Sequence, residues 1–398
     1  MEKPVILGGT PVRNTHIYYG TQYIDDDDIA AMSEALRGRL ITTGPRVASA
    51  EATLCGVTGA KYATVMANGT AALHLACMAA GIGPEDEVIT TPITFAATAN
   101  AVLYAGGTVV FADIDPETYL IDSDEVEKHI TAKTKAVIAV DYTGQVANMD
   151  ALRQICERHG LLLIEDAAHS IGSKFNGKPV GSIADLTCFS FHPVKTVTAG
   201  EGGAVTTNDP ELYKKVKALR THGMAYTEEL FVNESHGRWY HEQQDLGFNY
   251  RMTDFQAALL ESQLHKLNRF AARRKEIVRR YNEAFSSMPE LILQKNDPRS
   301  DTVNHLYVLQ LNLSLLNCTH REFFYAMDAE RVVCQVHYIP VYYHPYYQRL
   351  GYKKGLCPLA EKLYEGIISI PLYYGLSDED VSDVIHAVKK TISWYKKG

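Results

Sequence analysis

The sequence predicts an α/β fold: a large domain with a mostly parallel central sheet flanked by helices, followed by a smaller α+β C-terminal domain. Between residues 62 and 166, short apolar runs rich in β-branched residues alternate with helical segments, a pattern typical of parallel strands joined by crossover helices. A chain of 398 residues with 46% hydrophobic composition is long enough to divide into two domains.

The expected elements of the large domain follow an extended arm. The acidic run from Asp25 to Asp28 ends this arm and marks the start of a helix. The strands expected after it, each followed by a helical segment, are YATVMA (62–67), EVITT (87–91), TVVFADI (108–114), KAVIAV (135–140) and LLLIED (161–166). Such sheets place their ligands at the carboxyl ends of the strands.

After Thr207 the pattern becomes helical, and residues 251–285 indicate one long helix or a kinked pair. The last hundred residues mix short strands with helices, the final one capped by Ser377. We therefore divide the chain into four parts: an N-terminal arm (1–30), a large cofactor-binding domain (31–250), a connecting helix (251–289) and a small domain (290–398).

Composition excludes several classes of function. Lys and Arg total 39 against 47 Asp and Glu, a net charge of -8, so no basic surface is offered to nucleic acid or to an anionic membrane. The seven cysteines are scattered and never in a C-x-x-C pair, which indicates free thiols in a reducing compartment and no metal site. Because neither a signal peptide nor a long apolar segment is apparent, we expect a cytoplasmic protein.

Two charged residues follow strands of the expected sheet. Asp166 ends LLLIED, where its carboxylate is either a helix cap or a group offered to a ligand. Lys195 follows LTCFSF in a loop closed by Gly200, Gly202 and Gly203, which let the backbone approach a bound group. A lysine is ordinarily a solvated surface charge, but burial between apolar strands lowers its pKa toward the range where the neutral amine attacks a carbonyl.

A third feature is the strand-to-helix turn Asn68-Gly69-Thr70, where backbone N–H groups, a helix N-terminus and a hydroxyl suit a phosphate. Such turns are common, so the turn alone indicates little. Together, however, the three features match pyridoxal 5'-phosphate (PLP), which needs a lysine for its aldehyde, a carboxylate for its pyridine nitrogen and a cradle for its phosphate. In this interpretation Lys195 also carries the proton between the substrate carbon and the cofactor.

Longer segments resemble a known family over nearly the whole chain. They are ANGTAALHLA, ITTPITFAATANAV, DAAHSIGS, FSFHPVKTVTAGEGGAVTTND, HGM and GFNYRMTDFQAAL. With them the chain resembles the sugar-nucleotide aminotransferases of the DegT family, which are PLP-dependent transferases of fold type I. The resemblance implies an aminotransferase with Lys195 and Asp166 as its catalytic residues.

The resemblance also implies cofactor-binding roles. Gly69, Thr70 and Ser190 would hold the phosphate. Asn249 resembles the residue that these enzymes send into the neighbouring subunit's phosphate site. The resemblance therefore implies a homodimer with shared active sites.

The cofactor ring has expected partners as well. By resemblance, Phe95 would stack on the pyridine ring, Asp166 would pair with its nitrogen, and His169 would lie near its hydroxyl side. His192, beside the lysine loop, is either a partner of one of these groups or a packed aromatic residue.

The segment HYIPVYYHPYY is the candidate substrate surface. Its tyrosines suit sugar or nucleotide contacts, although tyrosine-rich patches more often pack a small domain against its neighbours. His337 and Tyr338 are the best candidates within it, and His305 in NHLY is a weaker one. The cluster comprises Tyr338, Tyr342, Tyr343, Tyr346 and Tyr347.

The segments most resemble the subgroup that aminates C4 of a UDP-linked 4-keto-6-deoxy-N-acetylhexosamine, with L-glutamate as donor, in pseudaminic acid biosynthesis. Other acceptors, dTDP-linked or 3-keto sugars, remain alternatives. A dinucleotide-binding oxidoreductase is disfavoured because the run from Gly81 to Asp86 lacks a third glycine. Lys195 argues against the family's dehydratases, which carry histidine there, and a non-catalytic regulatory protein would have lost Lys195 or Asp166.

Overall fold

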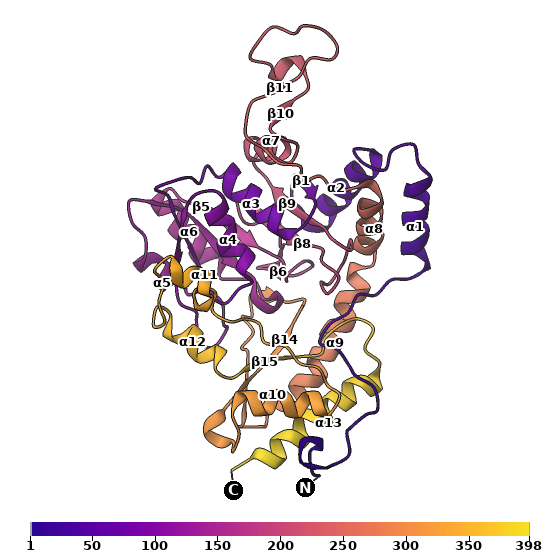
Figure 1. Cartoon of the computed structure of the whole chain (residues 1–398), viewed down its shortest axis with the longest axis vertical. Helices are drawn as coiled ribbons and strands as arrows, with labels where there is room; N and C mark the ends of the chain where they lie inside the picture. The colour runs from indigo at the N-terminus through magenta and orange to yellow at the C-terminus, as the bar shows by residue number, and fades with distance from the viewer. Residues whose placement is uncertain (1, 398) are drawn as a thin grey trace.

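The computed structural model describes residues 2–397 and centres on a seven-stranded sheet (Figure 1). The strands run in the order β1-β9-β8-β5-β4-β2-β3. Every neighbouring pair is parallel except those formed by β9, which runs antiparallel to both β1 and β8. The predicted mostly parallel sheet is therefore confirmed. Its strands are β1 (Tyr62–Met66), β2 (Glu87–Thr90), β3 (Thr108–Phe111), β4 (Thr134–Val140), β5 (Leu162–Asp166), β8 (Leu186–Ser190) and β9 (Gly203–Thr207).

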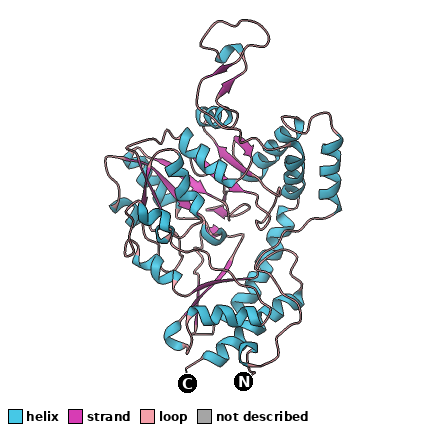
Figure 2. Ribbon diagram, in the orientation of Figure 1, coloured by secondary structure: helices cyan, strands magenta, loops and turns pink. Residues whose placement is uncertain are grey.

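Helices cover both faces of this sheet (Figure 2). Apolar side chains of α3, α4 and α7 form one buried cluster, and those of α2, α6 and α8 form a second one. The arrangement follows from the sequence because strands buried on both faces are apolar along their whole length. The helices around the sheet are α1 (Asp26–Arg37), α2 (Pro45–Thr58), α3 (Gly69–Ala79), α4 (Ala96–Tyr104), α5 (Ser123–Lys128), α6 (Met149–His159), α7 (Pro210–Leu219) and α8 (Asp254–His265).

Two expectations about helix ends are confirmed. The side chain of Asp25 accepts from the N–H of Asp28, whose own side chain accepts from the N–H of Asp25, so the acidic run is a capping box for α1. Residues 251–285 form the kinked pair rather than one helix: α8 is followed, after Lys266, by α9 (Leu267–Phe285).

The C-terminal part is built around three antiparallel strands, β12 (Leu291–Leu293), β14 (Tyr307–Leu311) and β15 (Ile367–Ile370). A third buried cluster joins these strands to α9, α10 and α13. Ser377 caps α13 through a capping box with Asp380, as expected. The helices of this part are α10 (His320–Ala329), α11 (Pro345–Arg349), α12 (Pro358–Tyr364) and α13 (Asp378–Tyr395).

A narrow arm projects from the body beyond α7 (Figure 1). It is formed around the hairpin of β10 (Met224–Ala225) and β11 (Glu242–Gln243). A small sheet elsewhere joins β13 (Ser300–Asp301), β6 (Lys174–Phe175) and β7 (Lys178–Pro179).

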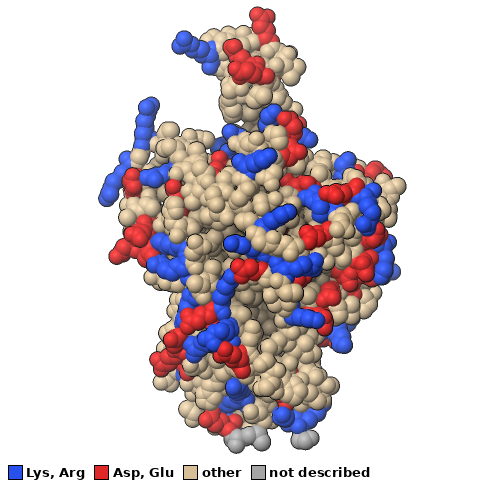
Figure 3. All heavy atoms as spheres, turned by 180° about the vertical axis from the view of Figure 1, so that it is seen from behind, with Lys and Arg blue, Asp and Glu red and all other residues tan. Residues whose placement is uncertain are grey.

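Acidic and basic side chains are interspersed over the face shown in Figure 3. Across residues 2–397, no helix combines the length and the apolar character needed to cross a membrane.

Two carboxyl groups, Asp141 and Glu165, are buried together under the carboxyl end of the sheet. Both side chains are fully buried. Asp141 accepts from Ser170 Oγ at 2.6 Å and from the N–H of Ala147 at 3.0 Å, while Glu165 accepts from Thr187 Oγ1 at 2.8 Å. Burial raises the pKa of both groups, and the Glu165 charge raises the pKa of Asp141 further. The pair therefore retains a proton in the folded protein.

We expect Glu165→Gln to make the fold less sensitive to alkali. The unfolded chain releases the pair's proton above pH ~5, so a rise in pH favours unfolding by up to about 1.4 kcal/mol per unit until the folded pair itself ionises. Glutamine cannot ionise and removes the Glu165 charge that raises the pKa of Asp141, so only the effect of burial on the Asp141 pKa remains. The melting temperature of the variant should thus fall less between pH ~5 and ~8 than that of the wild type.

The matched control for this experiment is Glu157→Gln, at the exposed end of α6. It should follow the wild-type pH dependence. If Glu165→Gln declines with pH as steeply as the wild type and the control, the pair does not hold the proton.

Candidate active site

A pocket of about 810 Å³ opens at the carboxyl ends of β4, β5 and β8. This is where a parallel sheet is expected to bind its ligand. Every residue assigned a catalytic, cofactor-binding or substrate role from the sequence lines this pocket except Asn249, and the wider tyrosine cluster is described below. The lining residues among them are Gly69, Thr70, Phe95, Asp166, His169, Ser190, Lys195, His305, His337 and Tyr338.

The turn before α3 provides an anion cradle at one end of the pocket. The Asn68 side chain accepts from the N–H of Ala71 at 2.8 Å and so fixes the first turn of the helix. Helix geometry leaves the preceding N–H groups without intrahelical acceptors. A Cβ atom on Gly69 would lie 2.8 Å from Ser190 Cβ, so glycine is required for the turn to reach the end of β8. Two backbone donors and the hydroxyls of Thr70 and Ser190 thus suit a phosphate.

Asp166 ends β5 with its carboxylate buried at 5% exposure. Thr98 Oγ1 donates to one oxygen at 2.7 Å and the N–H of Ala168 to the other at 3.1 Å. Burial raises the pKa of this carboxyl, although both hydrogen bonds and the Lys195 charge oppose the shift. Among residues 2–397, no basic side chain forms an ion pair with the Asp166 carboxylate within 4.0 Å. A protonated ring nitrogen entering the pocket would supply that partner.

Lys195 lies in the loop between β8 and β9, and its N–H donates to the carbonyl of His192 at 2.9 Å. Burial lowers the pKa of its ammonium group to about 8, and the Asp166 charge partly opposes this shift. A substantial fraction of the amine is therefore neutral near neutral pH. A neutral amine is the form that attacks an aldehyde.

Histidines and tyrosine form another wall of the pocket. His169 Nε2 lies 3.0 Å from Tyr338 Oη, and its ring centroid is 4.7 Å from that of His305. Burial and the Lys195 charge hold the pKa values of His169 and His305 well below the usual range. His337 bonds Ser369 Oγ through Nδ1 at 2.9 Å, and burial lowers its pKa to about 3. The imidazoles are therefore neutral at physiological pH.

Three predicted residues are exposed. The Phe95 side chain is 63% exposed at the start of α4, with its ring 6.3 Å from that of Tyr338. His192 is exposed and lines the pocket, so it is not a packed aromatic residue within this chain. Asn249 is exposed outside the pocket, where it bridges to Thr221.

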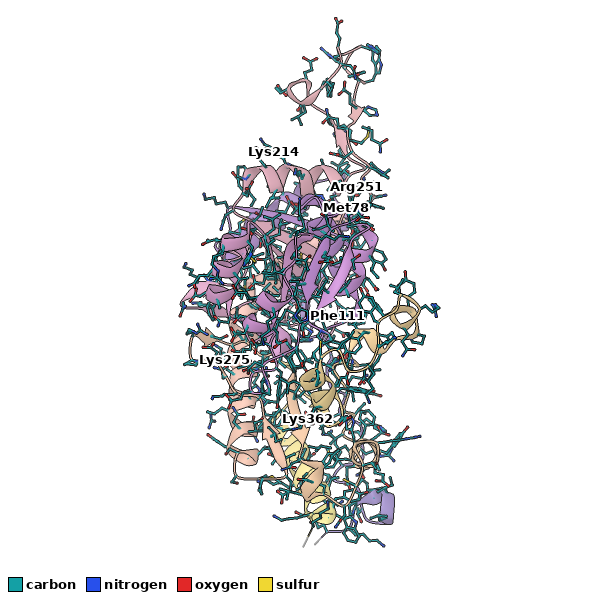
Figure 4. All side chains as sticks on the ribbon, turned by 90° about the vertical axis from the view of Figure 1, so that its left-hand side faces the viewer. Met78, Phe111, Lys214, Arg251, Lys275 and Lys362 are labelled. Atoms are coloured by element: carbon teal, nitrogen blue, oxygen red, sulfur yellow. The ribbon has the colours of Figure 1, made fainter. Side chains whose placement is uncertain are left out.

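The tyrosine cluster divides between two roles. Tyr338 alone of the five lines the pocket, whereas Tyr342 and Tyr347 are buried and bond Glu361 and Asn100. Phe111 marks the junction between the sheet and the C-terminal part (Figure 4), and its ring meets those of Tyr342 and Tyr347 there at 5.4 and 6.2 Å. Tyr342 and Tyr347 therefore pack the two parts together.

Several pocket residues were not named individually by the sequence prediction. They are supplied by the N-terminal segment, by α4, by the loop that contains Gly200, Gly202 and Gly203, and by the segment before α11: Tyr19, Thr98, Glu201, Gln335 and His344. The signal for Thr98 was weak because Thr98 lies in α4, whereas its partner Asp166 ends β5. Tyr19 stands in a segment read only as an arm.

The residues present fit PLP. The cradle suits its phosphate, the buried Asp166 carboxylate suits its pyridine nitrogen, and the desolvated Lys195 amine suits its aldehyde. The Nδ1 atoms of His169 and His305 are also buried without a partner among the described residues, which leaves polar atoms for a ligand's hydroxyl groups.

Comparisons with known proteins agree with this chemistry. The model of the DegT/DnrJ/EryC1/StrS aminotransferase family matches residues 22–389. The spore coat polysaccharide biosynthesis protein SpsC of Bacillus subtilis is 41% identical over 382 residues, which cover 96% of this chain and 98% of that protein. The UDP-4-amino-4,6-dideoxy-N-acetyl-beta-L-altrosamine transaminase of Campylobacter jejuni is 36% identical, with coverage of 96% and 99%.

A solved structure is also similar. Helicobacter pylori PseC, an aminotransferase involved in the biosynthesis of pseudoaminic acid, matches with a TM-score of 0.88 and 33% identity. The match covers 96% of this chain and 100% of PseC.

We expect the rate at which PLP attaches covalently to Lys195 to rise with pH around a midpoint of about 8, because only the neutral amine reacts. In Asp166→Asn the midpoint should move to lower pH, since the aspartate charge no longer favours the ammonium form. The protein without cofactor would be mixed with PLP, trapped with borohydride and analysed by peptide mass spectrometry.

Lys195→Ala is the control and should give no labelled peptide. Labelling of that variant would show that another lysine binds the cofactor. An unchanged midpoint in Asp166→Asn would contradict the electrostatic link between the two residues.

Proposed function

Because the chain belongs to the DegT/DnrJ/EryC1/StrS family of PLP-dependent sugar aminotransferases, we propose that it transfers an amino group from L-glutamate to C4 of a UDP-linked 4-keto-6-deoxy-N-acetylhexosamine. The observation that carries the proposal is the similarity to the Campylobacter jejuni altrosamine transaminase over 96% of the chain. The likeness to PseC supports a place in pseudaminic acid biosynthesis.

The cofactor-binding residues have separate tasks in this proposal. When bound, PLP supplies a reactive aldehyde and a ring that accepts electrons. Gly69, Thr70 and Ser190 would bind the phosphate, and Phe95 would contact the ring. Asp166 would hold a proton on the pyridine nitrogen, and His169, whose Nε2 lies within hydrogen-bond distance of Tyr338 Oη, would serve the ring hydroxyl.

Lys195 then has two tasks. Its neutral amine would hold the cofactor through the aldehyde, and Nζ, once free, would be placed to accept or donate the proton at the reacting substrate carbon. Burial suits both tasks, because it brings the pKa of Lys195 to about 8, close to the working pH.

The substrate side of the pocket is assigned to His337, Tyr338 and His305. A pocket of about 810 Å³ is larger than an amino acid requires and lies within the range typical of sites for larger ligands. Aromatic and neutral imidazole side chains suit the faces and hydroxyls of a sugar.

An alternative acceptor is supported by one observation. SpsC, named for polysaccharide biosynthesis, is 41% identical, compared with 36% for the altrosamine transaminase. This similarity supports a keto-sugar nucleotide other than the altrosamine precursor, and a dTDP-linked or a 3-keto sugar is the second candidate. A regulatory protein without activity is disfavoured because both Lys195 and Asp166 are retained in the pocket.

We further propose a homodimer in the cytoplasm. Asn249 is exposed away from its own pocket, which suits a residue that completes the phosphate site of a second copy. All seven cysteines are free thiols, which suits a reducing compartment.

The substrate proposal is tested with purified protein, PLP and L-glutamate. A panel of UDP- and dTDP-linked 3-keto and 4-keto sugars would be followed by mass spectrometry for amino-sugar nucleotides. We expect the UDP-linked 4-keto-6-deoxy-N-acetylhexosamine to be aminated at least about tenfold more efficiently than the others, since a few hydrogen bonds to the correct sugar give such discrimination.

Exclusive conversion of a dTDP-linked or 3-keto sugar would replace the proposed acceptor with the second candidate. Conversion of ordinary 2-keto acids alone would contradict the sugar assignment.

The shared site predicts complementation between two inactive variants. Lys195→Ala lacks the reactive amine, and Asn249→Asp places a negative charge beside the partner's phosphate. In a mixed dimer one of the two sites contains both intact residues, so activity should return toward about a quarter of wild type after random exchange of equal amounts.

Subunit exchange would be verified by native mass spectrometry with tagged chains. No recovery in verified mixed dimers, with each parent variant inactive, would show that Asn249 does not serve the partner's site.

A further inference from the structure

Arg274 is a buried cation on an apolar stripe. It lies in α9, where the buried residues recur at helical spacing: Leu267, Phe270, Arg274, Ile277, Tyr281 and Phe285. The side chain is 2% exposed. A guanidinium in such a position is costly without a carboxylate, and an apolar residue would fill the place without that cost.

The guanidinium has carbonyl partners instead of an acid. Nη1 donates to the carbonyls of Leu372 at 3.0 Å, His305 at 3.2 Å and Asn304 at 3.3 Å. Its Nε is buried without a partner in the described part of the chain, and burial lowers its pKa to about 10. The next residue, Lys275, points outward instead and pairs with Asp301 at the surface (Figure 4).

The three carbonyls belong to two segments that reach the pocket. His305 itself lines the pocket, next to His169. The N–H of Leu372 donates to the carbonyl of Tyr19 at 3.1 Å, and Tyr19 lines the pocket with its ring 5.2 Å from that of His337. The Arg274 side chain thus joins α9 to the backbone of both segments.

We propose that Arg274 is a positioning residue that fixes His305 and Tyr19 and thereby sets the shape of the substrate side of the pocket. The residues proposed to hold the cofactor lie elsewhere: Lys195 in the loop after β8, Asp166 at the end of β5 and Gly69 at the start of α3. Arg274 forms no hydrogen bond with these three residues. Its loss therefore affects substrate binding more than cofactor chemistry. The inference rests on the proposed function for the identity of the substrate alone.

The test compares Arg274→Met with Arg274→Lys. Methionine fills the space but donates nothing, whereas lysine restores a cationic donor to the carbonyls. We expect Arg274→Met to raise KM for the keto-sugar nucleotide about tenfold, equivalent to about 1.4 kcal/mol, with kcat and the glutamate half-reaction changed less than about twofold. Arg274→Lys should recover about half of the loss on a logarithmic scale.

A second readout does not depend on the substrate. Hydrogen exchange of the backbone amides in residues 303–306 and 372–373 should accelerate about tenfold or more in Arg274→Met, because these segments lose their shared donor. The matched control is Arg279→Met, which removes an exposed arginine from the same helix. It should leave both the exchange and KM at wild-type values.

The outcomes separate the two proposals. If the wild type aminates none of the sugars while Arg274→Met still loosens both segments, the proposed substrate fails and the anchoring stands. Wild-type exchange in a folded Arg274→Met protein overturns the inference. It is also overturned if kcat, the glutamate half-reaction and KM all deteriorate together and Arg274→Lys restores none of them, since that pattern is general destabilisation.

Discussion

The burial of one carboxylate organises the cofactor site. Asp166 lies at the end of β5 with two neutral donors, the Thr98 hydroxyl and the Ala168 N–H, and among residues 2–397 it forms no ion pair within 4.0 Å. Such a group is stable in a protein only when a ligand or a pKa shift balances its charge. The position of Lys195, close enough for its charge to act on Asp166, follows from the same need. A bound pyridinium would balance the negative charge of the Asp166 carboxylate.

The residues that line the pocket come from two parts of the chain. The sheet supplies the phosphate cradle, Asp166 and Lys195 from the ends of separate strands. The C-terminal part supplies His305, His337 and Tyr338, held by packing between tyrosines and the sheet. One side of the pocket therefore rests on the ends of the sheet strands, and the other side rests on loops of the C-terminal part.

The sequence predicted what depends on local pattern. Strand, turn and helix signals placed Gly69, Asp166 and Lys195 correctly within one pocket, since the ends of neighbouring strands meet at one edge. The family resemblance supplied the aminotransferase chemistry, and the family match confirms it. The helix boundaries were also largely predictable, because capping residues such as Asp25 and Ser377 are local signals.

Long-range contacts were not predictable in the same way. Thr98 in α4 donates to Asp166 at the end of β5, and no local signal connects the two residues. The burial of Arg274 was not predicted because the residue lies in the charged segment AARRKEIVRR. Its spacing from Phe270 and Ile277 is nevertheless that of a core position. His192 remained undecided because its exposure depends on how the lysine loop lies over the pocket.

The antiparallel strand β9 also constrains when the site forms during synthesis. β1 joins the sheet through β9, which is the last of the seven strands to leave the ribosome. A nascent chain that ends before residue 203 can pair its parallel strands, but its β1 has no strand partner, because β9 is what joins β1 to β8. The strand that leads into the Gly69 turn therefore enters the sheet only after the last strand has been synthesised.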